Sequence, residues 1–146
     1  MRTPTPEIRE AFYRRLLESL PIGQVTASDI AWPNSNFRAD PERYYLAPAI
    51  MYAQTETVTL SPKGYEKLNG IFQINICGLP NQGEGELDYM ARKLTDIFRA
   101  GTRIELCGWW PVTITRAYRS QLRFGGHDRP EITVSANWEQ FTPKGE

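Results

Sequence analysis

The sequence predicts an α+β domain built as a two-layer sandwich, in which two helices cover one face of a mainly antiparallel sheet. Two observations predict this class: two segments carry apolar residues at helical spacing, and several others alternate strictly between apolar and polar residues. The alternation runs through 72–76, 112–115 and 132–138 and is typical of a sheet buried on one face only. Because 146 residues is a natural length for one domain, we expect residues 1–146 to fold together.

The first helix is predicted between Pro4 and Pro21. Its apolar positions recur every three or four residues, and Glu7 lies in the first turn, where a negative charge is favourable. Residues 24–46 contain prolines, small polar residues and four aromatic residues. This composition predicts a long ordered loop that packs onto the body of the domain.

A long β-hairpin is predicted next. One strand spans 49–60, a Ser-Pro-Lys-Gly segment at 61–64 supplies the turn, and the return strand spans 65–77. Gly70 inside the return strand is predicted to form a bulge. A second helix follows the Gly-rich turn at 78–85 and ends before Gly101.

The last third of the chain is predicted to be β structure again. The strands are expected at 103–107, 112–118 and 132–140, with a loop at 119–130 before the last of them. We expect residues 142–146 to be a frayed tail.

The second face of the predicted sheet is polar and almost free of charge. Its members are Thr55, Thr57, Thr59, Gln73, Asn75, Thr113, Thr115, Thr133, Ser135 and Asn137. Threonine is common on solvated sheet faces, so one interpretation is a surface that contacts only water. The other is a surface that meets another subunit or lines a shared channel, because the centres of protein interfaces are depleted of charge.

No pattern in the sequence indicates catalysis, a cofactor or a metal. His127 is the only histidine and has no nucleophile near it in sequence, and there is no phosphate-binding glycine motif. Cys77 and Cys107 lie in apolar stretches and are predicted to be inert core thiols. The 17 basic and 17 acidic residues cancel, which disfavours specific nucleic-acid binding, and no segment has the length of a membrane span.

Two segments are candidates for contact with a protein partner. They are the hairpin tip and the loop at 119–130, both of which combine cationic and aromatic side chains. The alternatives are a solvated turn for the tip and base stacking on nucleic acid for the loop. The candidate interface residues are Lys63, Tyr65, Lys67, Thr113, Thr133, Arg123, Phe124, His127 and Arg129.

The order of motifs resembles one known family. Ala31-Trp32-Pro33-Asn34 follows the first helix, Gly70-Ile71-Phe72-Gln73-Ile74 lies in the return strand, and Pro111-Val112-Thr113-Ile114 precedes the closing strand. Together they resemble the small tail-completion, or tail-terminator, proteins of tailed bacteriophages and prophages. The resemblance covers nearly the whole chain, and Trp-Pro-Asn is its most distinctive local part.

The resemblance implies a structural virion protein rather than an enzyme. Such proteins cap the tail tube as a ring, commonly of six copies, and their partners are copies of themselves, the major tail tube protein and the head–tail connector protein. It also implies assembly in the host cytoplasm and a final place in the virion tail, with no catalytic residue, cofactor or membrane. The alternatives are another head–tail connector, a minor tail protein, or a small-ligand or RNA-binding α+β domain.

Overall fold

The computed structural model describes residues 4–53, 56–57, 64–124 and 129–143, and two helices and seven strands lie within these ranges. In chain order the elements are α1 (Thr5–Glu18), the 3₁₀ helix η1 (Ala27–Asp29), β1 (Tyr45–Tyr52), β2 (Glu56–Thr57), β3 (Tyr65–Cys77), α2 (Gly85–Ile97), β4 (Arg103–Leu106), β5 (Trp109–Arg119), β6 (Arg123–Phe124) and β7 (Pro130–Pro143). The strand order is β1-β3-β7-β5-β4, with β2 beside β3 and β6 beside β7. All these pairs are antiparallel, which confirms the predicted α+β class.

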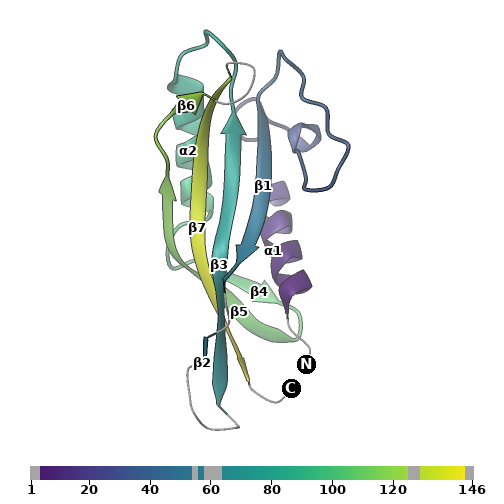
Figure 1. Ribbon diagram of the computed structural model, residues 1–146, viewed down its shortest axis with the longest axis vertical. Helices are drawn as coiled ribbons and strands as arrows, with labels where there is room; N and C mark the ends of the chain where they lie inside the picture. Colours follow the sequence, from purple (N-terminus) through teal and green to yellow (C-terminus); the bar gives the residue numbers. More distant parts are fainter. Residues whose placement is uncertain (1–3, 54–55, 58–63, 125–128, 144–146) are drawn as a thin grey trace.

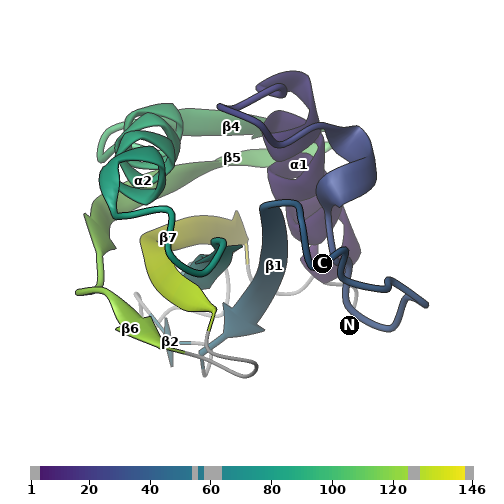
Figure 2. The same ribbon diagram turned by 90° about the horizontal axis from the view of Figure 1, so that it is seen from above.

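The sheet is curled and does not form a flat layer. Figure 2 shows β1, β3 and β7 as one wall and β4 and β5 turning across the far side, with both helices between them. The pairing register shifts between Ile114 and Arg116 in β5 and between Ile104 and Leu106 in β4. Such bulges bend a strand and increase its twist. The two-layer detail of the prediction is therefore not confirmed, although both helices lie against the concave, apolar face.

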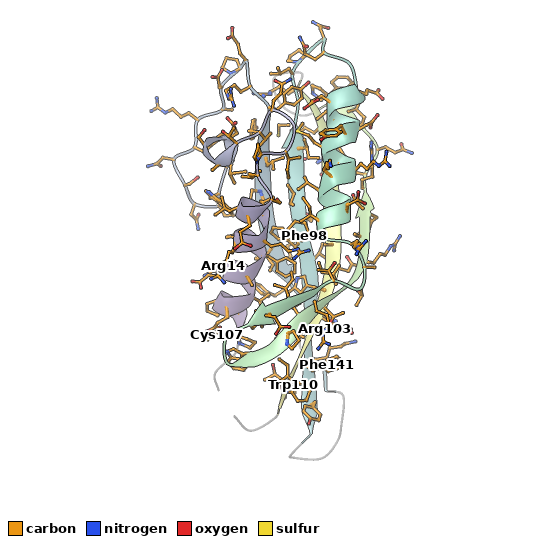
Figure 3. All side chains as sticks on the ribbon, turned by 180° about the vertical axis from the view of Figure 1, so that it is seen from behind. Arg14, Phe98, Arg103, Cys107, Trp110 and Phe141 are labelled. Atoms are coloured by element: carbon orange, nitrogen blue, oxygen red, sulfur yellow. The ribbon has the colours of Figure 1, made fainter. Side chains whose placement is uncertain are left out.

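The core forms where the helices meet the alternating strands. The ring of Phe12 on α1 lies 4.8 Å from that of Phe72 on β3 and 6.1 Å from that of Trp138 on β7. Phe98, just after α2, completes the cluster at 5.2 Å from Phe72 and lies between the two helices in Figure 3. All four side chains are buried. Leu17 on α1 is apolar but 42% exposed, so it lies outside this core.

The predicted hairpin exists and begins earlier than expected. Tyr45 starts β1 and pairs with Cys77, and the register continues without a shift to Tyr52 opposite Gly70. The prediction of a bulge at Gly70 is wrong, because β3 also pairs with β7 through Gly70 without a shift. A Cβ atom at Gly70 would lie 2.0 Å from the Met51 carbonyl oxygen, so the glycine admits the neighbouring strand. The predicted turn residues 61–63 lie outside the described residues.

Strand β7 is longer than predicted. It continues to Pro143 because its last residues pair with Tyr65 and Glu66 at the start of β3. Thr142 is buried and donates a 2.6 Å hydrogen bond to Oε1 of Gln140, so Thr142 is part of the sheet and not of a frayed tail. Residues 144–146 lie outside the described part. The predicted loop at 119–130 contains the short strand β6, which pairs with Glu131 and Pro130.

Candidate functional site

The convex side of the sheet carries a polar surface over its two central strands. The polar face, as we call it, consists of Gln73, Asn75, Thr133, Ser135 and Asn137 on β3 and β7. Their alternating neighbours point into the core, and the registered pairs Gln73–Ser135 and Asn75–Thr133 bring them side by side. Figure 1 shows these two strands at the centre of the sheet with the helices behind them. Of the other predicted members, Thr55 and Thr59 lie outside the described residues.

One end of the polar face carries charge. Arg123 on β6 donates from Nη2 to Oγ1 of Thr133 at 2.6 Å and to Oδ1 of Asn75 at 3.1 Å. The same nitrogen lies 3.5 Å from a carboxylate oxygen of Glu131. Arg123 and Thr133, both predicted as contact residues, are therefore brought together and bonded to each other. Their network holds β6 against the sheet.

Cys77 lies at the same end of β3 and is buried. Burial, more than any other cause, raises the pKa of its thiol to about 11, so the thiol stays protonated and unreactive at neutral pH. Burial likewise raises the pKa of the neighbouring Tyr45 to about 12. The prediction of an inert core thiol is confirmed for Cys77. It is wrong for Cys107, which is exposed in the tight turn between β4 and β5 (Figure 3).

Arg129 was predicted to be a contact residue, but the structure places it inside the domain. Its guanidinium donates from Nε to Gly78 O at 2.8 Å, from Nη1 to Asp40 O at 3.1 Å and from Nη2 to Arg43 O. It also lies 4.9 Å from the ring centre of Tyr45. The planar guanidinium group has several N–H donors and can bond several carbonyl oxygens at once. Arg129 therefore joins its own segment to Gly78 and to the loop at 40–43, and its guanidinium is not available to a partner.

Phe124 is the most exposed large apolar side chain among the described residues, at 71%. It follows Arg123 on β6 and is held by pairing with Pro130. Single exposed apolar side chains are common on protein surfaces, but the pairing of β6 fixes the position of this ring, and exposed aromatic rings are frequent anchors of protein contacts. His127, predicted in the same loop, lies outside the described residues.

The opposite end of the sheet forms an arm, where β3 and β7 extend beyond the body (Figure 1). Tyr65 on the arm is 37% exposed, and its ring lies 4.9 Å from that of Trp110, which is 50% exposed. Lys67 lies two residues further along β3, opposite Phe141 and Glu56. Figure 3 shows Trp110 and Phe141 near this arm. Lys63 lies outside the described residues.

The predicted contact residues thus belong to two separate places and do not form one site. Tyr65 and Asn75 are ten residues apart on β3, a span of roughly 33 Å along an extended strand. Thr113 lies between them, opposite Glu139 on β7 and Arg103 on β4. Trp110 was not among the predicted contact residues. The sequence did contain a signal for it. Successive residues of a strand point to opposite faces, so one of the adjacent Trp109 and Trp110 must face outward.

Two open grooves flank α1. The first has a volume of about 380 Å³ and is lined by Arg9, Tyr13, Trp32, Pro33 and Asn34. The second, of about 340 Å³, is lined by Ala11, Arg14, Arg15, Glu18, Arg103, Ile104 and Glu105. Within the described ranges no three His, Cys, Asp or Glu side chains are grouped so that they could hold a metal ion. The helices in these ranges include none with the length and apolar character needed to cross a membrane.

The comparison with known families decides the identity of the chain. A family model described as phage tail terminator protein matches residues 7–138, from the first turn of α1 into β7. This chain belongs to the phage tail terminator family. The match confirms the resemblance drawn from the Trp-Pro-Asn segment and the order of motifs. The family is a structural one, so this terminator-family chain is a component of a phage tail.

Solved structures support the fold of this terminator-family chain. Nine solved chains match, and one of them superposes with a TM-score of 0.71 at 21% sequence identity, covering 93% of this chain and 94% of its own. At that identity the similarity establishes the fold alone. No curated protein matches the sequence.

Proposed function

We propose that this chain caps the phage tail tube as a ring of copies, six in number. The ring ends polymerisation of the major tail tube protein and offers a surface to the head–tail connector protein. The observation that carries this proposal is the family match over residues 7–138. The role is mechanical and needs no catalytic residue, cofactor or metal.

Length control by a cap requires a subunit with two unlike ends. The cap must bind the last layer of the tube, and it must not present the same surface on its outer side. The domain is elongated along the sheet, with the arm at one end and β6 and the turn before α2 at the other (Figure 1). The aromatic pair Tyr65–Trp110 is at the arm end, whereas Arg123 and Phe124 are at the other. The two ends therefore differ chemically, as a cap requires.

The arm end is the better candidate for the tube contact. Aromatic side chains dominate the binding energy of protein interfaces, and the Tyr65–Trp110 pair is exposed and already stacked. The backbone at Trp110 is held in place, because the Trp110 carbonyl oxygen accepts a 3.2 Å hydrogen bond from Nε2 of the buried Gln140. Such an anchored pair loses little conformational entropy when it binds.

The proposal is tested by mixing the purified protein with tubes of the major tail protein from the same phage. We expect the unchanged protein to bind tube ends and to stop their growth, as seen by sedimentation and by tube lengths in electron micrographs. The double variant Tyr65→Ala/Trp110→Ala should bind about tenfold more weakly or worse. Its matched control is Tyr89→Ala, which removes an aromatic ring 47% exposed on α2.

The outcomes separate the function from the surface. If the unchanged protein does not bind tubes, the capping function is wrong. If it caps tubes and the double variant caps them equally well, the function stands and the arm is not the contact. Circular dichroism of each variant shows whether the fold is retained.

A further inference from the structure

The first groove beside α1 is a preformed aromatic site. The rings of Tyr13 and Trp32 lie 4.8 Å apart with their planes tilted by 52°. Tyr13 also lies 6.0 Å from Phe72, so the groove is backed by the core. Ser35 donates from its backbone nitrogen at 3.2 Å and from Oγ at 2.7 Å to the Trp32 carbonyl oxygen, which fixes the loop that carries the indole.

The chemistry of this groove suits an aromatic side chain. Tilted rings accept a third ring edge-on or offset, and the exposed Arg9 at the rim adds a cation that attracts the face of a π system. Its volume of about 380 Å³ is within the range of pockets that hold small ligands. Among the described residues, the most exposed aromatic side chain is Phe124.

Phe124 cannot reach the groove of its own chain. Figures 1 and 2 agree that β6 and α2 lie on one flank of the domain and that α1 lies on the other. If Phe124 on one flank binds the Tyr13–Trp32 groove on the opposite flank of the next copy, the contact is heterologous, and every copy uses both surfaces. Such contacts generate rings when the rotation between copies closes.

Charge does not oppose a contact between the two flanks. On the Phe124 flank, Arg119 pairs with Asp88 at 2.6 Å and Arg123 pairs with Glu131 at 3.5 Å. Helix α1 on the other flank is balanced as well, with three acidic and three basic residues: Glu7, Glu10, Glu18, Arg9, Arg14 and Arg15. A contact between these flanks therefore depends mainly on aromatic packing.

We propose that neighbouring copies in the ring meet through these two flanks, with Phe124 of one copy seated in the groove between Tyr13 and Trp32 of the next. This inference rests on the proposed ring and names its subunit contact. Phe124 is held for this role by the hydrogen bonds of Arg123 to Asn75 and Thr133. The partner is a second copy of this chain.

Cysteine cross-linking tests the contact directly. The background is Cys107→Ser, since Cys107 is exposed and Cys77 is buried. Phe124→Cys and Arg9→Cys place one thiol on each flank, and each is treated with a short bis-maleimide free in solution and on tail tubes. We expect a mixture of the two single variants to give dimers and the double variant to give a ladder of dimers, trimers and higher species. Neither single variant alone should cross-link.

Other results overturn the proposal. Dimers from Phe124→Cys alone would show that identical flanks meet, and absence of cross-links both in solution and on tubes would show that these flanks do not meet. The capping function and the subunit contact can fail separately. If the protein forms the ladder but does not bind tubes, the contact is supported and the capping function is wrong. If it binds tubes but forms no ladder there, the capping function stands and the contact is wrong.

Association strength gives a second measurement. Phe124→Ala should weaken self-association, or association on tubes, about tenfold or more, because an exposed aromatic anchor carries much of an interface's energy. Gln73→Ala on the polar face, outside the proposed contact, is the control and should change it less than about threefold. Equal weakening by both variants would mean that Phe124 is not the anchor.

Discussion

At the residue scale, buried charge holds the irregular parts of this domain in place. Asp29 at the end of η1 accepts hydrogen bonds from Nε and Nη2 of Arg43 at 2.9 and 2.6 Å. It also accepts one from the Thr26 backbone nitrogen at 2.9 Å. With Arg129, this pair ties the loop between α1 and β1 to the sheet. That loop carries Trp32, so the aromatic groove depends on these contacts.

The Asp29 network predicts a pH-dependent stability. The hydrogen bonds from Arg43, the largest cause, lower the pKa of Asp29 from 3.8 to about 2. A carboxylate with a lowered pKa stabilises the folded state above its unfolded pKa, and this stabilisation is lost as the pH falls from 3.8 through about 2. Asp29→Asn should therefore reduce the free energy of unfolding at pH 6 by about 1–3 kcal/mol.

Urea unfolding of the unchanged protein and of Asp29→Asn at pH 6, 4 and 2 measures this effect. The difference between the two proteins should shrink toward pH 2, because Asp29 is then becoming protonated. Asp96→Asn, on the exposed side of α2, is the control and should differ little at any of these pH values. A difference that stays constant across the range would contradict the assignment of the ion pair.

At the element scale, β3 and β7 organise the molecule. They pair over their whole lengths, from Tyr65 opposite Pro143 to Cys77 opposite Glu131. One side of the pair bears Phe72 and Trp138 in the core, and the other bears the polar face. The arm exists because both strands continue beyond the helices that cover the core (Figure 1). The core, the arm and the polar face therefore depend on the register of this one pair.

Gly70 is the position where that register is most sensitive. A Cβ atom there would lie 2.0 Å from the Met51 carbonyl oxygen and 2.7 Å from Cζ2 of Trp138. We expect Gly70→Ala to lower the free energy of unfolding by about 1–3 kcal/mol, because neither the Met51 backbone nor the buried Trp138 indole has room to move. Thermal and urea unfolding measure the loss.

Gly85→Ala is the matched control for this substitution. A Cβ atom at Gly85 has no neighbour within 4 Å, and the residue opens α2. Alanine should leave the stability unchanged or raise it by about 0.5–1 kcal/mol, since it restricts the unfolded chain and favours helix. Equal stability of Gly70→Ala and the unchanged protein would contradict the close approach of Met51 and Trp138 to Gly70.

At the scale of the whole molecule, each direction has a separate proposed use. The flanks meet neighbouring copies, and the two unlike ends face the tube and the head connector. The convex polar face then remains as a wall of the ring, facing its channel or its outside. Ser135 in this face is buried, whereas the uncharged side chains of Gln73, Asn75 and Thr133 are partly exposed and suited to contact with water.

Thiol accessibility tests this arrangement. In the Cys107→Ser background, Gln73→Cys should react with a small maleimide at rates within about threefold before and after assembly, because the face stays solvated. Phe124→Cys should become at least about tenfold slower on assembly, since interface cores exclude water. Protection of Gln73→Cys would instead make the polar face a subunit contact, the other interpretation of its composition.

Much of this fold could be predicted because its determinants are local. Helix α2 is read from the spacing of Leu87, Met90 and Leu94, and β7 from the alternation of Ile132, Val134 and Ala136. The ends of elements were less predictable, because Thr142 lies in β7 only through its pairing with β3. The bulge assigned to Gly70 was wrong for the same reason, since the glycine is required by strands distant in sequence.

The sequence by itself determined the α+β class, the two amphipathic helices, the two-faced strands and, through its order of motifs, the tail terminator family. These follow from residue periodicity and from turn chemistry, which act over a few residues. Only the tertiary structure decided that the sheet curls, that Arg129 is an internal anchor and that Trp110 stacks on Tyr65. It also decided that Phe124 and the Tyr13–Trp32 groove lie on opposite flanks, because relative position in space depends on strand order, bulges and register between distant segments.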